Sequence, residues 1–144
     1  MLRLLLLPIS AILVVSGVSA YYLALEPATE ALDASLIDAG IAIRERIFVR
    51  DGLVTVDLPT AAEQVLRADR YDAVYYVVRD PGGNLIAGDS GIPLPPPGQQ
   101  AQDNVMFYDA EFRGARVRGA TLLAPCGKGP CAVTVAETTR KRDR

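Results

Sequence analysis

The sequence predicts an α+β domain that follows an N-terminal membrane helix. Three observations indicate this: an apolar run at the start, a helical stripe of apolar residues after it, and then short β-branched segments separated by turn signals. Helices followed by strands are typical of helices packed on one face of an antiparallel sheet. About 120 residues follow the apolar run, which is enough for one domain with its own core.

The apolar run, residues 2–25, carries one charge, Arg3. A helix of this length rises about 36 Å, enough to cross a hydrocarbon layer of about 30 Å. Tyr21 and Tyr22 lie near its far end, where aromatic belts occur. Residues 26–38 contain acids but no Lys or Arg, so the positive-inside rule places the N-terminus in the cytoplasm and the rest outside it.

A cleavable signal peptide is the alternative to a permanent anchor, because Val18, Ser19 and Ala20 match a small-residue cleavage pattern. The apolar run continues past that point, which favours the anchor. In both cases the domain is exported. The predicted organisation is a transmembrane anchor, an exported domain and a short basic end, over residues 1–25, 26–139 and 140–144.

The exported part starts with a predicted long helix over residues 28–47, in which apolar residues recur at helical spacing. Asp51 and Gly52 indicate a turn. Pro59 begins a short predicted helix that ends near Arg67. We predict strands over residues 53–58, 73–79, 85–88, 105–112, 116–124 and 132–137, of which 73–79 has the apolar character of a central strand.

Residues 89–104 form a predicted loop with prolines at positions 93, 95, 96 and 97. Proline lacks a backbone donor and favours an extended course. Long loops of this kind are either functional or plain surface connections.

Charge and composition exclude several functions. The net charge is −2, and a weakly acidic domain is a poor nucleic-acid binder because phosphate contacts need a concentrated basic face. The chain has no histidine, which excludes a histidine general base, a Ser-His-Asp triad and a histidine metal site. We expect no catalytic residues, no metal and no cofactor.

The two cysteines, Cys126 and Cys131, are separated by four residues, two of them glycine. If the flanking segments pair as a hairpin, the thiols lie within disulfide reach, and export places them in an oxidising compartment. We predict a structural disulfide between them.

The chain resembles the N-terminal domain of two-component sensor histidine kinases, in the group that includes the tricarboxylate-transport sensors. The resemblance rests on the leucine-rich anchor, on the proline run, and on the order and spacing of the segments 31–36, 54–59, 74–80, 83–89, 107–109 and 135–138. It implies a PAS- or Cache-like periplasmic sensor in the bacterial inner membrane, with a long helix packed on an antiparallel sheet. It also implies a homodimer in the full-length kinase.

Sensor kinases of this family continue into a second membrane helix, a histidine-bearing dimerisation helix and an ATPase domain, and none of these is found in residues 1–144. We therefore expect no kinase activity from this chain. We expect it to be either a fragment of a longer kinase or a truncated gene product. The resemblance implies a small carboxylate ligand or a periplasmic binding protein as partner. A membrane-anchored or secreted envelope protein that docks another protein is the alternative function. A hydrolase using Asp109, Glu111 and Glu137 is disfavoured, because their spacing does not require one.

Arginine is the expected partner of a carboxylate ligand, because its guanidinium can pair bidentately. The candidate ligand-binding residues are Arg79, Arg116, Arg118, Tyr76 and Tyr108, with the tyrosines as hydroxyl donors. Surface exposure of the arginines and core packing of the tyrosines are the alternatives. We expect Arg118→Ala to abolish the ligand response of the full-length kinase.

Overall fold

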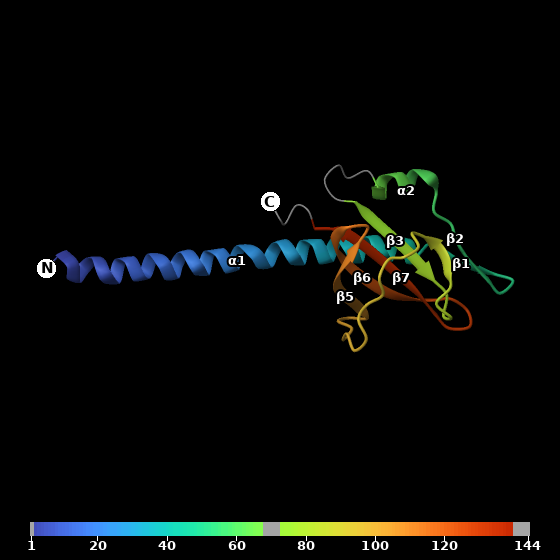
Figure 1. Cartoon of the computed structure of the whole chain (residues 1–144). Helices are drawn as coiled ribbons and strands as arrows, with labels where there is room; N and C mark the ends of the chain where they lie inside the picture. Colours follow the sequence, from blue (N-terminus) through green and yellow to red (C-terminus); the bar gives the residue numbers. More distant parts are fainter. Residues whose placement is uncertain (1, 68–72, 140–144) are drawn as a thin grey trace. The chain divides into compact units, whose positions relative to one another are not determined.

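The computed structural model describes residues 2–67 and 73–139 of the 144. Its contacts divide the chain into two compact units, Met1–Ala34 and Ser35–Arg144, and each is described by itself. The first helix, α1 (Leu2–Arg44), contributes residues to both units and continues without a break between them (Figure 1). Helix α1 includes Pro27, which lies between the apolar run and the predicted helix over residues 28–47.

The first unit consists of the apolar part of α1. Residues Leu6–Leu23 have a mean hydropathy of 1.9, and none of this stretch is buried. Leu7, Leu13 and Leu23 each expose about two thirds or more of their surface. By length and composition this is the one helix among the described residues that could cross a membrane.

The second unit begins with the end of α1, followed by a hairpin. β1 (Ile47–Arg50) pairs antiparallel with β2 (Leu53–Val56) around Asp51 and Gly52, which both have positive φ angles. Such a two-residue turn matches the twist of paired strands. The prediction that the long helix extends to Ile47 is therefore wrong, because the β-branched residues before the turn pair with those after it.

The main sheet has five antiparallel strands in the order β4-β3-β7-β6-β5. The predicted strands all occur, and the middle position belongs to β7, with β3 beside it. A second helix, α2 (Thr60–Arg67), precedes β3 as predicted. The strands are β3 (Val74–Arg79), β4 (Leu85–Gly88), β5 (Val105–Phe112), β6 (Ala115–Pro125) and β7 (Pro130–Thr138). The α+β fold is confirmed.

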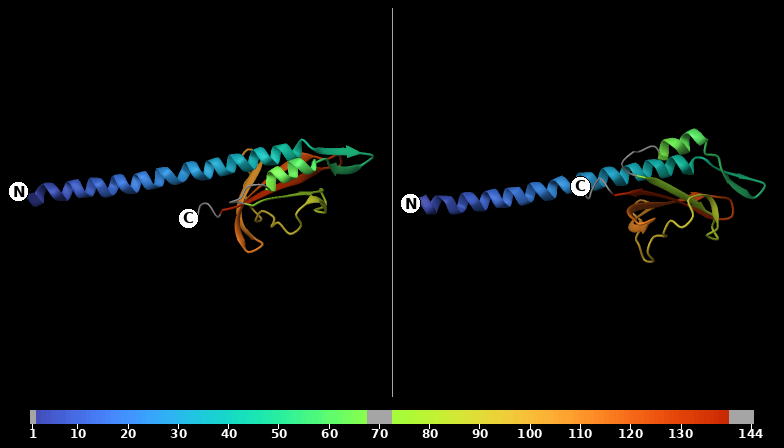
Figure 2. Two further views of the ribbon diagram at one scale, coloured as in Figure 1. Left: turned by 90° about the horizontal axis from the view of Figure 1, so that it is seen from above. Right: turned by 45° about the horizontal axis from the view of Figure 1, so that its top comes forward.

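The two faces of this sheet are covered by different parts of the chain (Figure 2). On one face lies the end of α1, where Leu36 and Ile43 are fully buried and Gly40 leaves room for Leu122. The other face is covered by residues 89–104, which we call the cover segment. Its Ile92 is buried in a core cluster with Val77, Phe112, Val117 and Ala136. Side chains alternate along each strand, so the register assigns every strand residue to the helix face or the cover face.

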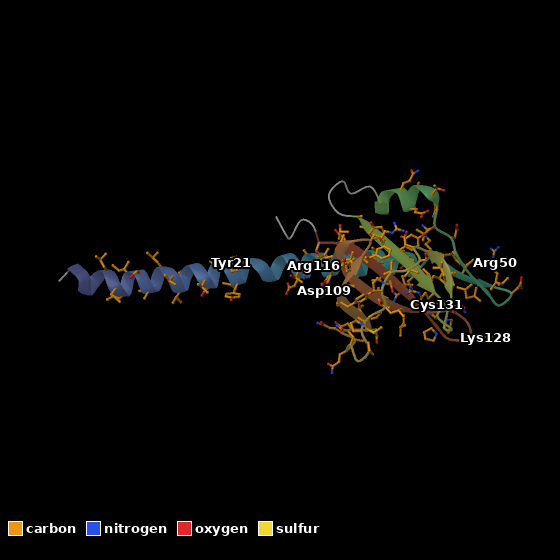
Figure 3. The ribbon with its side chains drawn as sticks, in the orientation of Figure 1. Tyr21, Arg50, Asp109, Arg116, Lys128 and Cys131 are labelled. Atoms are coloured by element: carbon orange, nitrogen blue, oxygen red, sulfur yellow. A yellow bond between two sulfur atoms is a disulfide. The ribbon has the colours of Figure 1, made fainter. Side chains whose placement is uncertain are left out.

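A disulfide joins Cys126 to Cys131 across the β6–β7 hairpin, as predicted. Both cysteines are buried, and their Cα atoms are 5.6 Å apart. In Figure 3, Cys131 and Lys128 lie at this end of the sheet, while Arg116 and Asp109 lie at the opposite end.

Candidate ligand-binding site

Arg79 is the last residue of β3, and its side chain lies on the cover face of the sheet. Its Nη2 donates a hydrogen bond of 3.1 Å to the backbone carbonyl of Ile92. Its Nη1 is buried and has no hydrogen-bond partner among the described residues. Leaving a buried donor unpaired costs about 1–3 kcal/mol, and more when the group is charged. Among residues 2–67 and 73–139, this guanidinium therefore has one donor atom, Nη1, that could donate a further hydrogen bond.

Three buried hydroxyl groups lie on the same face of the sheet. Tyr108 donates a hydrogen bond of 2.6 Å to the carbonyl of Pro93. The Oγ1 atoms of Thr121 and Thr134 are 2.8 Å apart. Each of these three side chains exposes 3 % or less of its surface. Buried polar groups on a sheet face are unusual in an apolar core and can serve as ligand contacts.

Burial raises the pKa of the Tyr108 phenol above its usual value. A hydrogen bond with Thr121 and the positive charge of Arg79 lower this pKa in turn, but burial is the larger effect. The phenol is therefore neutral near neutral pH and acts as a hydrogen-bond donor.

The sheet register explains why these residues come together. Thr134 on β7 lies between Val77 on β3 and Thr121 on β6. Tyr108 on β5 lies opposite Gly119 on β6. A Cβ atom at position 119 would come within 2.6 Å of the Tyr108 ring, so the ring can lie flat over β6 only because this residue is glycine.

A partly buried arginine that shares a sheet face with three hydroxyl groups suits an anionic ligand. A carboxylate accepts from guanidinium and hydroxyl groups together, and such charge-assisted bonds are the strongest of this type. Among the described residues, this cluster includes neither a nucleophile with an adjacent base nor a pair of carboxylates. Nor do the described residues hold any group of three or more possible metal ligands.

The predicted site residues divide between the two faces. Arg79 and Tyr108 lie on the cover face, whereas Tyr76, Arg116 and Arg118 lie on the helix face, as the register requires. The structure therefore does not bring all five together. The role of each in ligand binding stays a prediction.

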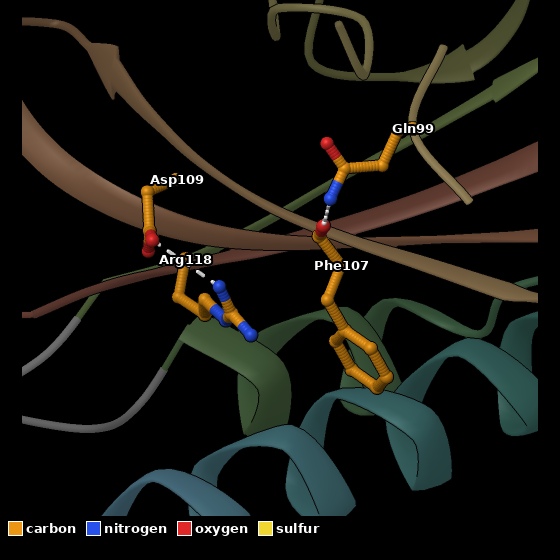
Figure 4. Close-up of polar contacts among 4 residues, drawn as sticks. All are labelled: Gln99, Phe107, Asp109 and Arg118. Carbon is orange, nitrogen blue, oxygen red and sulfur yellow. Dashed lines mark hydrogen bonds and ion pairs between the residues drawn. The ribbon is translucent and has the colours of Figure 1, made fainter. Parts of the chain in front are cut away.

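Arg118 illustrates the different surroundings on the helix face. Its Nη1 is 3.2 Å from Oδ2 of Asp109, and its guanidinium lies 5.5 Å from the ring centre of Phe107 (Figure 4). Asp109 is largely exposed, so this ion pair is in contact with water. The Arg118 side chain itself is only 18 % exposed, and unlike Nη1 of Arg79 its Nη1 has a carboxylate partner.

The sequence analysis did not select Thr121 and Thr134. Threonine is common in strands for packing reasons, so neither residue carries a signal by itself. The observed register of β6 against β7 places the two opposite each other.

The fold and the site define a small α+β domain with a membrane-spanning candidate helix, a helix-covered sheet face and a buried polar cluster on the other face. Residues 9–144 match the family of two-component sensor kinase N-terminal domains, and the chain belongs to this family. The match does not single out the tricarboxylate-transport group, which stays a prediction. No curated protein and no solved structure matches the chain.

Proposed function

We propose that this chain is the extracytoplasmic sensing domain of a two-component sensor kinase, and that it binds a small carboxylate between the sheet and the cover segment. The observation that carries the proposal is the buried Nη1 of Arg79, which has no hydrogen-bond partner in the described part of the chain. A sensor domain needs a site at which a bound ligand favours one conformation over another. An unpaired buried charge is such a site, because a ligand that pairs with it stabilises the conformation that binds the ligand.

The chemistry of the surrounding groups supports a carboxylate. Arg79 presents a planar fork, of which Nη2 already holds the Ile92 carbonyl while Nη1 remains unpaired. Tyr108, Thr121 and Thr134 supply hydroxyls on the same face. These groups could bind the second carboxylate or the hydroxyl of a di- or tricarboxylic acid.

Signal transmission would use α1. This helix includes the candidate membrane span Leu6–Leu23 and the buried residues Leu36 and Ile43 of the domain core. A ligand that favours one packing of the sheet against the end of α1 would bias the position of that helix. We propose that the N-terminus is cytoplasmic, that the domain is periplasmic, and that protomers pair in the full-length kinase.

The test uses the full chain, oxidised, in detergent micelles, titrated with citrate and succinate by calorimetry. We expect binding by the wild type and at least a tenfold loss of affinity in Arg79→Met. Arg118→Met is the matched variant on the helix face. From the sequence we expect a change at Arg118 to abolish the ligand response, whereas binding between the sheet and the cover segment predicts an affinity like that of the wild type. If Arg118→Met loses binding and Arg79→Met does not, the ligand binds the helix face instead.

A folded protein that binds neither compound would contradict the carboxylate proposal. Thermal unfolding gives a second readout, because a ligand at 100 times its Kd stabilises a protein by about 2.7 kcal/mol. If neither calorimetry nor unfolding responds to either compound, a domain that recognises a partner protein becomes the better explanation.

A further inference from the structure

The cover segment is attached to the sheet by the same side chains that form the proposed anion site. Arg79 holds the carbonyl of Ile92, and Tyr108 holds the carbonyl of the next residue, Pro93. Two adjacent backbone acceptors are thus bound by the two side chains best suited to a carboxylate. A ligand acceptor and the cover segment would compete for the same donors.

The proline content of the cover segment explains this mode of attachment. Pro93, Pro95, Pro96 and Pro97 have no backbone donor, so this stretch cannot pair with a neighbouring strand as a regular ladder. Its carbonyls still need hydrogen-bond donors when they are buried. Side chains from the sheet supply them, and side-chain bonds can be exchanged for ligand bonds without disrupting the sheet.

Further contacts determine how firmly the segment is held. The Ile92 side chain exposes 2 % of its surface and packs in the core cluster. At the far end of the segment, Nε2 of Gln99 donates a bond of 2.6 Å to the carbonyl of Phe107 on the edge strand β5 (Figure 4). Gln99 is exposed, and its contact is distant in sequence from the Arg79 contact. The segment therefore has one apolar attachment and several polar ones.

We propose that the cover segment is a lid, latched by Arg79 and Tyr108 in the unliganded domain, and that an anion bound at Arg79 displaces the Ile92 carbonyl and releases it. This inference rests on the proposed function. The ligand then binds only molecules whose lid is open. The apparent association constant therefore equals the intrinsic association constant multiplied by the fraction of molecules with an open lid. Weakening a lid attachment that does not contact the anion should tighten binding.

The experiment combines hydrogen exchange with citrate titration of the full chain in micelles. Citrate should increase amide exchange in the peptide that covers residues 89–99. Gln99→Ala should increase this exchange without ligand and tighten citrate binding by about 2- to 10-fold, the effect of losing one hydrogen bond. Ile92→Ala should act in the same direction more strongly. Gln99→Ala remains informative if Ile92→Ala does not fold, because Gln99 is exposed.

The possible outcomes distinguish the lid proposal from the proposal of a carboxylate site. If citrate binds, but exchange over residues 89–99 stays constant or falls and Gln99→Ala binds like the wild type, the lid is refuted and the carboxylate site stands. If neither the wild type nor Gln99→Ala binds citrate, both proposals are refuted. Release of the segment by citrate together with tighter binding by Gln99→Ala would support the lid.

Discussion

Replacing Arg79 with methionine distinguishes a ligand-binding arginine from a structural one. A structural arginine contributes to the free energy of unfolding, whereas a binding arginine can be neutral or costly until the ligand arrives. Methionine has a similar length and packs into irregular space, so the change removes the charge and the donors while retaining volume.

The structure provides the two opposing contributions. Loss of the Nη2 bond to Ile92 should cost about 1.5–3 kcal/mol, because the donor is charged. Removal of the unpaired Nη1 should return about 1–3 kcal/mol. The expected net change in unfolding free energy therefore lies between a gain of about 1.5 and a loss of about 2 kcal/mol. Val77→Ala, two residues earlier on the same face and fully buried, should lower it by about 2 kcal/mol or more.

Urea unfolding followed by far-ultraviolet circular dichroism measures both variants, with the midpoint shift at constant slope giving the difference. Saturating citrate should then stabilise the wild type and leave Arg79→Met unchanged. A loss of more than about 2 kcal/mol in Arg79→Met without ligand would refute the reasoning, since the arginine would then behave as a structural residue like Val77.

Three further predictions concern stability. Replacing both Cys126 and Cys131 with alanine should lower the unfolding free energy by about 2 kcal/mol, on the chain-entropy estimate for a six-residue loop, and should match the reduced wild type in the same denaturation assay. Gly119→Ala should destabilise by about 1–3 kcal/mol because its Cβ would press on the Tyr108 ring, whereas Gly82→Ala, next to flexible side-chain ends, should have little effect on the melting temperature. The pKa of Tyr108 is raised in the folded state, so its contribution to the unfolding free energy is present below the unfolded pKa near 10 and is lost as pH rises through the folded pKa. Tyr108→Phe should therefore flatten the decline of stability at alkaline pH. An unchanged slope of stability against pH would contradict this.

Local sequence patterns predicted the membrane-spanning candidate, the strands of the main sheet and the disulfide, because each of these depends on residues that are close in the sequence. The apolar run, the β-branched segments and the turn residues identified the membrane-spanning candidate and all five strands of the main sheet. The Cys126–Cys131 disulfide was also predictable, since a tight hairpin brings both cysteines together whatever the rest of the sheet does. Ile47 was assigned wrongly because its helical spacing competed with the pairing of β1 and β2, and pairing prevailed.

The composition of the site depended on contacts between distant segments. Alternation along β6 already places Arg116 and Arg118 on one face, as the sequence indicated. Whether that face is also the face of Arg79 depends on the register of β3 against β7 and of β7 against β6. A shift of one residue in either pairing would reverse the answer. The sequence by itself thus predicted the candidate membrane helix, the five strands of the main sheet and the disulfide. Only the tertiary structure, through strand register and the cover segment, decided that Arg79 and Tyr108 lie on one face of the sheet and Arg116 and Arg118 on the other.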